Sequence, residues 1–138
     1  MTTVISTKAR SVAAVALDAF DGGTLQIRTG SPPGPNAAVS GTLLASITLP
    51  TPAFTESNGV LTLSGTWQDS SANATGTAGH FRIIQSGDAG GATGSTDERI
   101  EGTVTVTGGG GDLTLTAVNI TAGDDVTITS ATLTVPAS

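Results

Sequence analysis

The sequence predicts a mainly β protein: a β-sandwich or jelly roll of about seven or eight antiparallel strands with one short N-terminal helix. The chain of 138 residues contains 19 glycines, 25 threonines and 13 serines, and small or β-branched residues favour short strands joined by turns. After residue 23 apolar and polar residues alternate with a period of two, as in strands that bury one face. Turn-forming residues interrupt this alternation roughly every ten residues, a spacing typical of such folds.

The first 23 residues follow a different pattern, and we expect them to form an arm and a helix. Between Lys8 and Phe20 apolar residues recur at offsets of three and four, which predicts an amphipathic helix that ends before Gly22-Gly23. Its end charges oppose the helix dipole, so docking must hold it in place. The apolar stripe consists of Ala9, Val12, Ala13, Ala16, Leu17 and Phe20. We expect residues 24–138 to form the β-sandwich, and the whole chain to be a single domain.

The alternation also gives the positions of the strands and of the longer loops. The expected strands cover Thr24–Arg28, Gly41–Leu49, Val60–Trp67, His80–Gln85, Ile100–Val106, Leu113–Ala117 and Val126–Val135. The expected loops are the proline-rich Ser31–Asn36, the polar Gln68–Gly79 and the glycine-rich Ser86–Thr96.

Two features near the C-terminus carry more specific predictions. The run Gly108–Gly111 stands between two alternating stretches, so it predicts a β-hairpin. In the last strand the apolar positions change phase between Ile128 and Leu133. One extra residue near Ser130-Ala131 would restore the phase, which predicts a β-bulge or a strand that crosses between sheets.

Residues that could carry chemistry are few and dispersed. His80 is the single histidine, and its place directly before Phe81 on an expected strand favours a half-buried or loop-end histidine over a member of a catalytic triad. Asp124-Asp125 lies in an expected turn and lacks the spacing of a calcium loop, so we expect turn capping there. We therefore expect no catalytic residue, no metal site and no cofactor.

Aromatic residues are equally scarce, which bears on carbohydrate binding. Trp67 is the only tryptophan, and the chain has three phenylalanines and no tyrosine. Sugar-binding modules stack aromatic rings on their ligand, and the expected loops Gln68–Gly79 and Ser86–Thr96 contain none. Trp67 is expected in the core or in an interface.

Composition also limits the kinds of partner that the protein can bind and the places where it can act. Five basic against eleven acidic residues give a formal net charge of −6, which makes nucleic acid an unfavourable partner. The longest apolar run is far shorter than a membrane span, and the N-terminus lacks the pattern of a signal peptide. The absence of cysteine excludes disulfides and thiolate metal sites.

The order of several stretches resembles small structural proteins encoded among the head and head–tail genes of tailed bacteriophages. After the predicted helix these stretches are Asp21–Gly30, Gly41–Ala45, Ala74–Ile83, Glu101–Val104, Asp112–Leu115 and Ile120–Gly123. His80 departs from the family pattern, in which an aromatic residue commonly precedes the Phe81-Arg82 pair. The resemblance covers nearly the whole chain and implies a virion structural protein without enzymatic activity, but it does not specify a position on the particle. The acidic net charge is compatible with the outer surface of the particle, so we expect the protein to be made in the host cytoplasm and placed there.

These observations together favour a capsid decoration or cement protein that forms homo-oligomers and contacts the major capsid protein or head–tail proteins. A head–tail, collar or fibre-associated subunit is the alternative within the virion, and a carbohydrate-binding receptor module is the alternative of another class. The arm of Met1–Ser6 and the helix after it are expected to tether the protein. The candidate interface residues are Lys8, Arg10, Val12, Trp67 and Phe81.

Overall fold

The computed structural model describes residues 20–34, 36–57, 60–63, 65–92 and 99–134 of the chain. The predicted arm and helix lie outside these residues except for Phe20. That residue occupies a short 3₁₀ turn and is 1% exposed. Gly22, two residues further on, has a φ of +70°, the left-handed conformation expected of a residue that ends such a turn.

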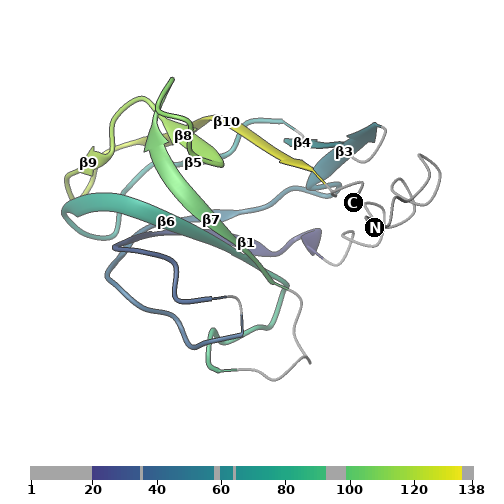
Figure 1. Cartoon of the computed structure of the whole chain (residues 1–138), viewed down its shortest axis with the longest axis horizontal. Coiled ribbons are helices and arrows are strands. Elements are labelled where there is room, and N and C mark those ends of the chain that lie inside the picture. The colour runs from purple at the N-terminus through teal and green to yellow at the C-terminus, as the bar shows by residue number, and fades with distance from the viewer. Residues whose placement is uncertain (1–19, 35, 58–59, 64, 93–98, 135–138) are drawn as a thin grey trace, which may run out of the picture.

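The described chain is mainly β, as the sequence predicts (Figure 1). Its strands are β1 (Thr24–Thr29), β2 (Leu43–Thr48), β3 (Phe54–Ser57), β4 (Val60–Leu63), β5 (Gln68–Asp69), β6 (Gly76–Ile84), β7 (Arg99–Val106), β8 (Leu113–Leu115), β9 (Asn119–Ile120) and β10 (Val126–Thr134). The sequence did not predict β3 or β9, and it assigned β5 and the start of β6 to a polar loop.

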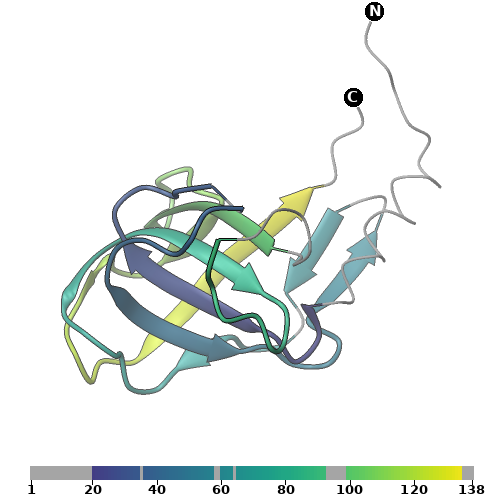
Figure 2. The same cartoon turned by 90° about the horizontal axis from the view of Figure 1, so that it is seen from below.

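The strands form one strongly curved sheet that nearly closes into a barrel. Their order is β2-β1-β6-β7-β8-β10-β4-β3, while β5 pairs with β10 and β9 with β6. Closure comes from β5, because Asp69 Oδ2 accepts a hydrogen bond of 2.9 Å from the amide of Ser46 in β2. The β3–β4 hairpin lies to one side of this barrel, where β4 pairs with the C-terminal end of β10 (Figures 1 and 2).

The apolar residues of the alternating strands fill the inside of the barrel. Leu25 pairs with Ile83 and Ile27 with Phe81, and each of these four side chains is at most 1% exposed. Trp67 is also 1% exposed, and its ring meets Phe54 edge-on with centroids 5.4 Å apart. Burial of large apolar side chains on this scale is the main source of folding free energy in a domain of this size.

The predicted hairpin at Gly108–Gly111 was wrong, because β7 and β8 pair in parallel with Val104 opposite Leu113. The connection runs back along β7 before β8 begins: the amide of Gly111 donates to Thr105 Oγ1 at 2.9 Å. A Cβ on Gly109 or Gly111 would lie 2.8 Å from a side-chain atom of Thr105, so only glycine permits this approach. The other strand pairs in the described part of the chain are antiparallel.

The predicted irregularity in the last strand is confirmed. The register of β10 against β8 shifts between Ile128 and Ser130. The strand pairs with β5 at Val126 and Thr127, with β8 on both sides of the shift from Ile128 to Ala131, and with β4 from Thr132 onward, so it passes from the barrel to the hairpin. The extra residue lets apolar side chains on both halves of β10 face inward.

Candidate functional site: two loops braced by buried charges

The outer face of β1, β6 and β7 carries charged side chains that are buried, which is unusual for a protein of this kind. In register, Arg82 of β6 lies between Gln26 of β1 and Glu101 of β7. Alternation within each strand puts these residues on the face opposite the core. The side chains of Arg82 and Glu101 are 1% and 4% exposed. Charged residues are almost never buried to this degree unless they are paired.

The ion pair of Arg82 and Glu101 holds the backbone of the β1–β2 connection. Arg82 Nε donates to Glu101 Oε2 at 2.8 Å, and the Nη2 atom also contacts that oxygen. The same Nη2 donates to the carbonyl of Gly34 at 2.9 Å, while Glu101 Oε1 accepts from the amide of Gly34 at 3.0 Å. Both backbone groups of one loop residue are therefore bound by one ion pair.

A second ion pair holds the β6–β7 connection. Arg99 donates to both carboxylate oxygens of Asp88, at 2.6 and 2.7 Å, and these side chains are 2% and 1% exposed. Such a two-point contact fixes geometry as well as charge. Asp88 Oδ1 also accepts the amide of Gly90 at 2.7 Å, so the carboxylate shapes its own loop.

The two connections are joined to each other. The carbonyl of Ala37 accepts from Arg82 Nη1 at 2.9 Å and from Arg99 Nη1 at 3.3 Å. The amide of Val39 donates to the carbonyl of Gly90 at 3.0 Å. We call residues 30–42 and 85–92 the braced loops, since two buried ion pairs hold them against the sheet and against each other.

The charges of this network influence one another. The hydrogen bond from Arg99, aided by the amide of Gly90, lowers the pKa of Asp88, although burial acts in the opposite direction. Burial, and then the nearby charge of Arg82, lowers the pKa of Arg28, which stays cationic at neutral pH because a guanidinium titrates far above it. Arg28 reaches outward to the carbonyl of Gly41 at 3.2 Å, which adds another contact to the first braced loop.

His80 belongs to this architecture. Its side chain is 1% exposed, and Nδ1 lies 3.0 Å from the carbonyl of Gly30 at the start of the first braced loop. Neither ring nitrogen of a histidine so enclosed is presented to a substrate in solution. His80 is thus more buried than the half-buried or loop-end histidine that the sequence predicts, and it joins β6 to the first braced loop.

The exposed surface of the braced loops consists of small or uncharged residues. The exposed members are Gly30, Ser31, Pro32, Pro33, Asn36, Ala38, Ser40, Gly41 and Thr42 in the first loop, and Ser86, Gly87, Ala89, Gly91 and Ala92 in the second. Because these side chains are short, the shape of the surface is the shape of the backbone, which the buried charges fix from beneath.

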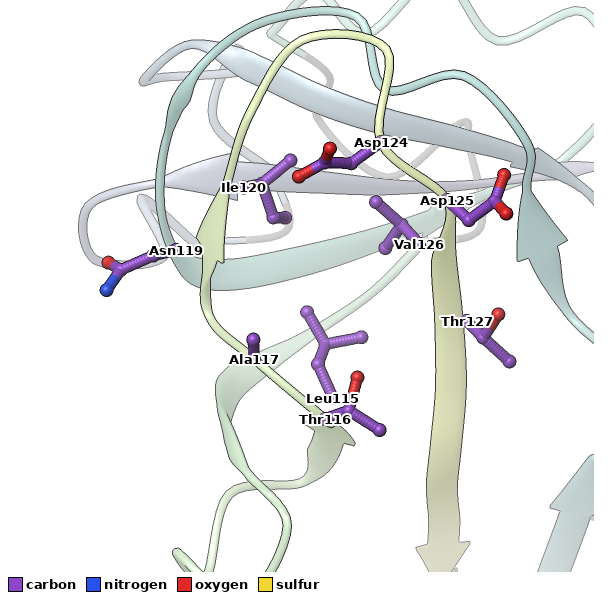
Figure 3. A pocket seen from close by; sticks show the side chains of 9 residues that line it. All are labelled: Leu115, Thr116, Ala117, Asn119, Ile120, Asp124, Asp125, Val126 and Thr127. Atoms are coloured by element: carbon purple, nitrogen blue, oxygen red, sulfur yellow. The ribbon is translucent and has the colours of Figure 1, made fainter.

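A hollow of about 70 Å³ lies on the β8–β9–β10 side of the barrel. Leu115, Ile120 and Val126 form its apolar part, whereas Asn119 points away from it and Asp124 and Asp125 point in different directions (Figure 3). Asp124 Oδ2 caps the turn by accepting the amide of Thr121 at 3.0 Å, as expected for this position. The polar groups do not converge on one point.

Neither metal-binding clusters nor membrane spans occur in the described part of the chain. No three histidine, aspartate or glutamate side chains among these residues come together as a metal site. No helix in the same residues is long and apolar enough to cross a membrane.

The structure corrects the sequence-based interface in part. Trp67 and Phe81 are core residues at 1% exposure and do not present their side chains to another protein. Of the two positions expected for Trp67, core or interface, the structure shows the core. Lys8, Arg10 and Val12 lie outside the described residues. Sequence reasoning missed the four charges of the two buried ion pairs. Alternation places Arg82 and Glu101 at outward positions of their strands, where charged residues are ordinarily solvated.

Comparison of the chain with protein-family models, with curated proteins and with solved structures gave no significant match.

Proposed function

We propose that the protein is a non-enzymatic structural component of a tailed-bacteriophage particle. In this proposal it is a capsid decoration or cement protein that self-associates and binds the outer surface of the head. The observation that carries the proposal is the pair of braced loops: the buried charges of the fold serve to hold a surface of short, uncharged side chains in one shape. A surface of that kind fits docking on another protein by shape.

Two further features support a structural role. The single histidine is enclosed between a strand and a loop, and the ion pairs are bound to backbone groups, so these residues serve architecture. The sequence resemblance to phage head and head–tail proteins supports the virion as the place of action. The formal net charge of −6 favours the outside of the particle over contact with packaged DNA.

Copy number in purified particles tests the virion role. We expect quantitative mass spectrometry of purified phage particles to find on the order of hundreds of copies per particle, because a decoration protein occupies many equivalent sites on a symmetric head. A copy number of about a dozen would instead assign it to a collar or tail position, where a single ring of subunits suffices. Absence from the particle would contradict the proposal.

A matched pair of variants tests the docking surface. Ala38 is exposed in the first braced loop, and Ala117 is exposed near β8 and β9, away from both loops. We expect Ala38→Lys to abolish rebinding of the purified protein to particles that lack it, because a long cation disrupts a close-packed contact. Ala117→Lys should rebind like the unaltered chain. Equal rebinding by both variants would exclude the braced loops as the docking surface.

A further inference from the structure

The first braced loop carries two adjacent prolines on the outside of the molecule. Pro32 and Pro33 are both exposed, and they directly precede Gly34, whose backbone is bound by the ion pair of Arg82 and Glu101. We call residues 31–33 the proline segment. Its apolar rings face solvent, and buried charges hold the residue that follows them.

The chemistry of proline restricts this segment further. A proline ring fixes φ at about −65°, and a residue that precedes a proline is confined to extended conformations. Ser31 and Pro32 both precede a proline, so Pro32 is restricted at both of its backbone angles to the polyproline II region. The proline segment therefore loses little conformational freedom when another molecule binds it.

The backbone around the two prolines has acceptors to offer but no donor. Pro32 and Pro33 have no amide N–H, and the N–H of Gly34 is already donated to Glu101 Oε1 at 3.0 Å. The carbonyl of Gly34 is also engaged, because it accepts from Arg82 Nη2 at 2.9 Å. Addition of a strand to a sheet needs backbone donors as well as acceptors, so a partner cannot bind these residues as a sheet edge. Proline rings and carbonyl oxygens are the groups that the segment can offer.

A groove lined by aromatic side chains matches these groups. Aromatic rings pack against proline rings, and a tryptophan N–H or a tyrosine O–H in the same groove donates to the carbonyls of a polyproline II segment. A charged groove would gain no ion pair here, because the exposed residues of the first braced loop carry no charge.

This chain cannot provide such a groove to a second copy of itself. Its sequence contains three phenylalanines, one tryptophan and no tyrosine. Phe20, Trp67 and Phe81 are each 1% exposed, and the partly buried ring of Phe54 packs edge-on against that of Trp67. A groove lined by several aromatic rings therefore has to belong to a different protein.

We propose that the proline segment inserts into an aromatic-lined groove of a different protein when the chain docks. The inference rests on the proposed function, in which that protein belongs to the head of the particle. Self-association then uses another surface of the molecule. The buried ion pair of Arg82 and Glu101 acquires a defined role, because it holds the segment ready for binding and reduces the ordering that docking requires.

Rebinding to particles that lack the protein tests the role of the proline segment. The test variant is Pro32→Ala with Pro33→Ala, and the control is Pro50→Ala, which alters an exposed proline outside both braced loops. We expect binding of the test variant to be at least about tenfold weaker, because it lacks both rings, and binding of the control to be unchanged. Equal binding by the two variants would overturn the inference and leave the proposed function intact. Failure of the unaltered chain to bind would overturn both.

A second measurement tests the chemistry of the partner and uses only the unaltered chain, so it does not depend on the folding of a variant. Hydroxyl-radical footprinting of the particles, with and without bound protein, identifies the side chains that the protein covers. We expect tryptophan or tyrosine side chains of a head protein to lose most of their oxidation when the protein is bound. Protection confined to side chains that are not aromatic would overturn the inference, even if the proline variant binds weakly.

Discussion

Both faces of the β1–β6–β7 sheet bury side chains, but through different interactions. On the inner face Leu25, Ile27, Phe81 and Ile83 pack against other apolar side chains. On the outer face Arg82 and its neighbours bind the backbone of two loops through hydrogen bonds of defined direction. Apolar packing is not directional, whereas these hydrogen bonds specify which backbone atom lies where.

The apolar packing of the inner face drives folding, whereas the hydrogen bonds of the outer face determine the shape of the surface. A buried ion pair adds little net stability compared with apolar residues of similar size, because desolvation offsets the attraction. The inner face therefore accounts for the stability of the barrel. The outer face accounts for the fixed path of the braced loops.

Truncation of the inner face should have the largest effect on stability. Phe81→Ala removes a ring that is 1% exposed and pairs across the sheet with Ile27 and Gly102. We expect a loss of about 3–5 kcal/mol in the free energy of unfolding, from lost burial and the cavity that remains. Urea denaturation measures it, and a loss below about 1 kcal/mol would place the core elsewhere.

Removing one partner of the Arg82–Glu101 ion pair should lower the free energy of unfolding nearly as much as Phe81→Ala does. Replacing both partners by apolar residues should not. Arg82→Ala leaves the carboxylate of Glu101 buried without its counter-charge, at a cost of about 3 kcal/mol. Arg82→Met combined with Glu101→Leu replaces the pair by apolar side chains and should change the unfolding free energy by less than about 1 kcal/mol. If the double variant is as unstable as Arg82→Ala, the outer face also supports the barrel and the division fails.

The second ion pair should reveal itself in the pH dependence of stability. Because the pKa of Asp88 is lower in the folded protein, its contribution is present above the ordinary aspartate pKa of about 4 and is lost as the pH falls through the folded value. Asp88→Asn should be destabilised by about 1.5 kcal/mol at pH 7 through loss of the charged hydrogen bonds. Its deficit relative to the unaltered chain should shrink at acid pH in denaturation series. A deficit independent of pH would show that the charge of Asp88 is not what braces the loop.

The smallest effect should come from backbone conformation within the first braced loop. Gly34 has a φ of +108°, which strains any residue with a Cβ, so Gly34→Ala should cost roughly 1 kcal/mol. Gly91 in the second braced loop has open space around it and no positive φ, so Gly91→Ala is the matched control and should change stability by only a few tenths of a kcal/mol. Thermal unfolding of the two variants compares them directly. Similar Tm values would mean that the conformation at Gly34 is not enforced.

The sequence predicts the inner face well and the outer face poorly, for one physical reason. Alternation identifies Leu25, Ile27, Phe81 and Ile83 as one buried set, because apolar residues at a period of two imply a covered face. It also places Arg82 and Glu101 outward, where charged residues are ordinarily solvated. Only three-dimensional structure shows that loops from elsewhere in the chain cover them.

The parallel pair of β7 and β8 could not be predicted for a related reason. A short glycine-rich connection between two alternating stretches usually joins antiparallel strands. Here Thr105 binds the connection and turns it back along its own strand. A side-chain contact of this kind does not alter the hydropathy pattern, so the sequence cannot show it. The change of phase in β10 is itself a feature of the hydropathy pattern, and the irregularity near Ser130 was therefore predictable.

Hydrogen exchange of the backbone amides tests most directly whether buried charges hold the braced loops. The comparison is between the unaltered chain and the double variant Arg82→Met/Glu101→Leu, followed by mass spectrometry of peptides from the loops and the strands. We predict faster exchange in both braced loops, greatest around Gly34 and Val39, whose amides bond to Glu101 and to Gly90, with the strands β1 and β6 unchanged. Undiminished protection of the loops in this variant would contradict the account, because it would mean that packing and not the ion pair holds them.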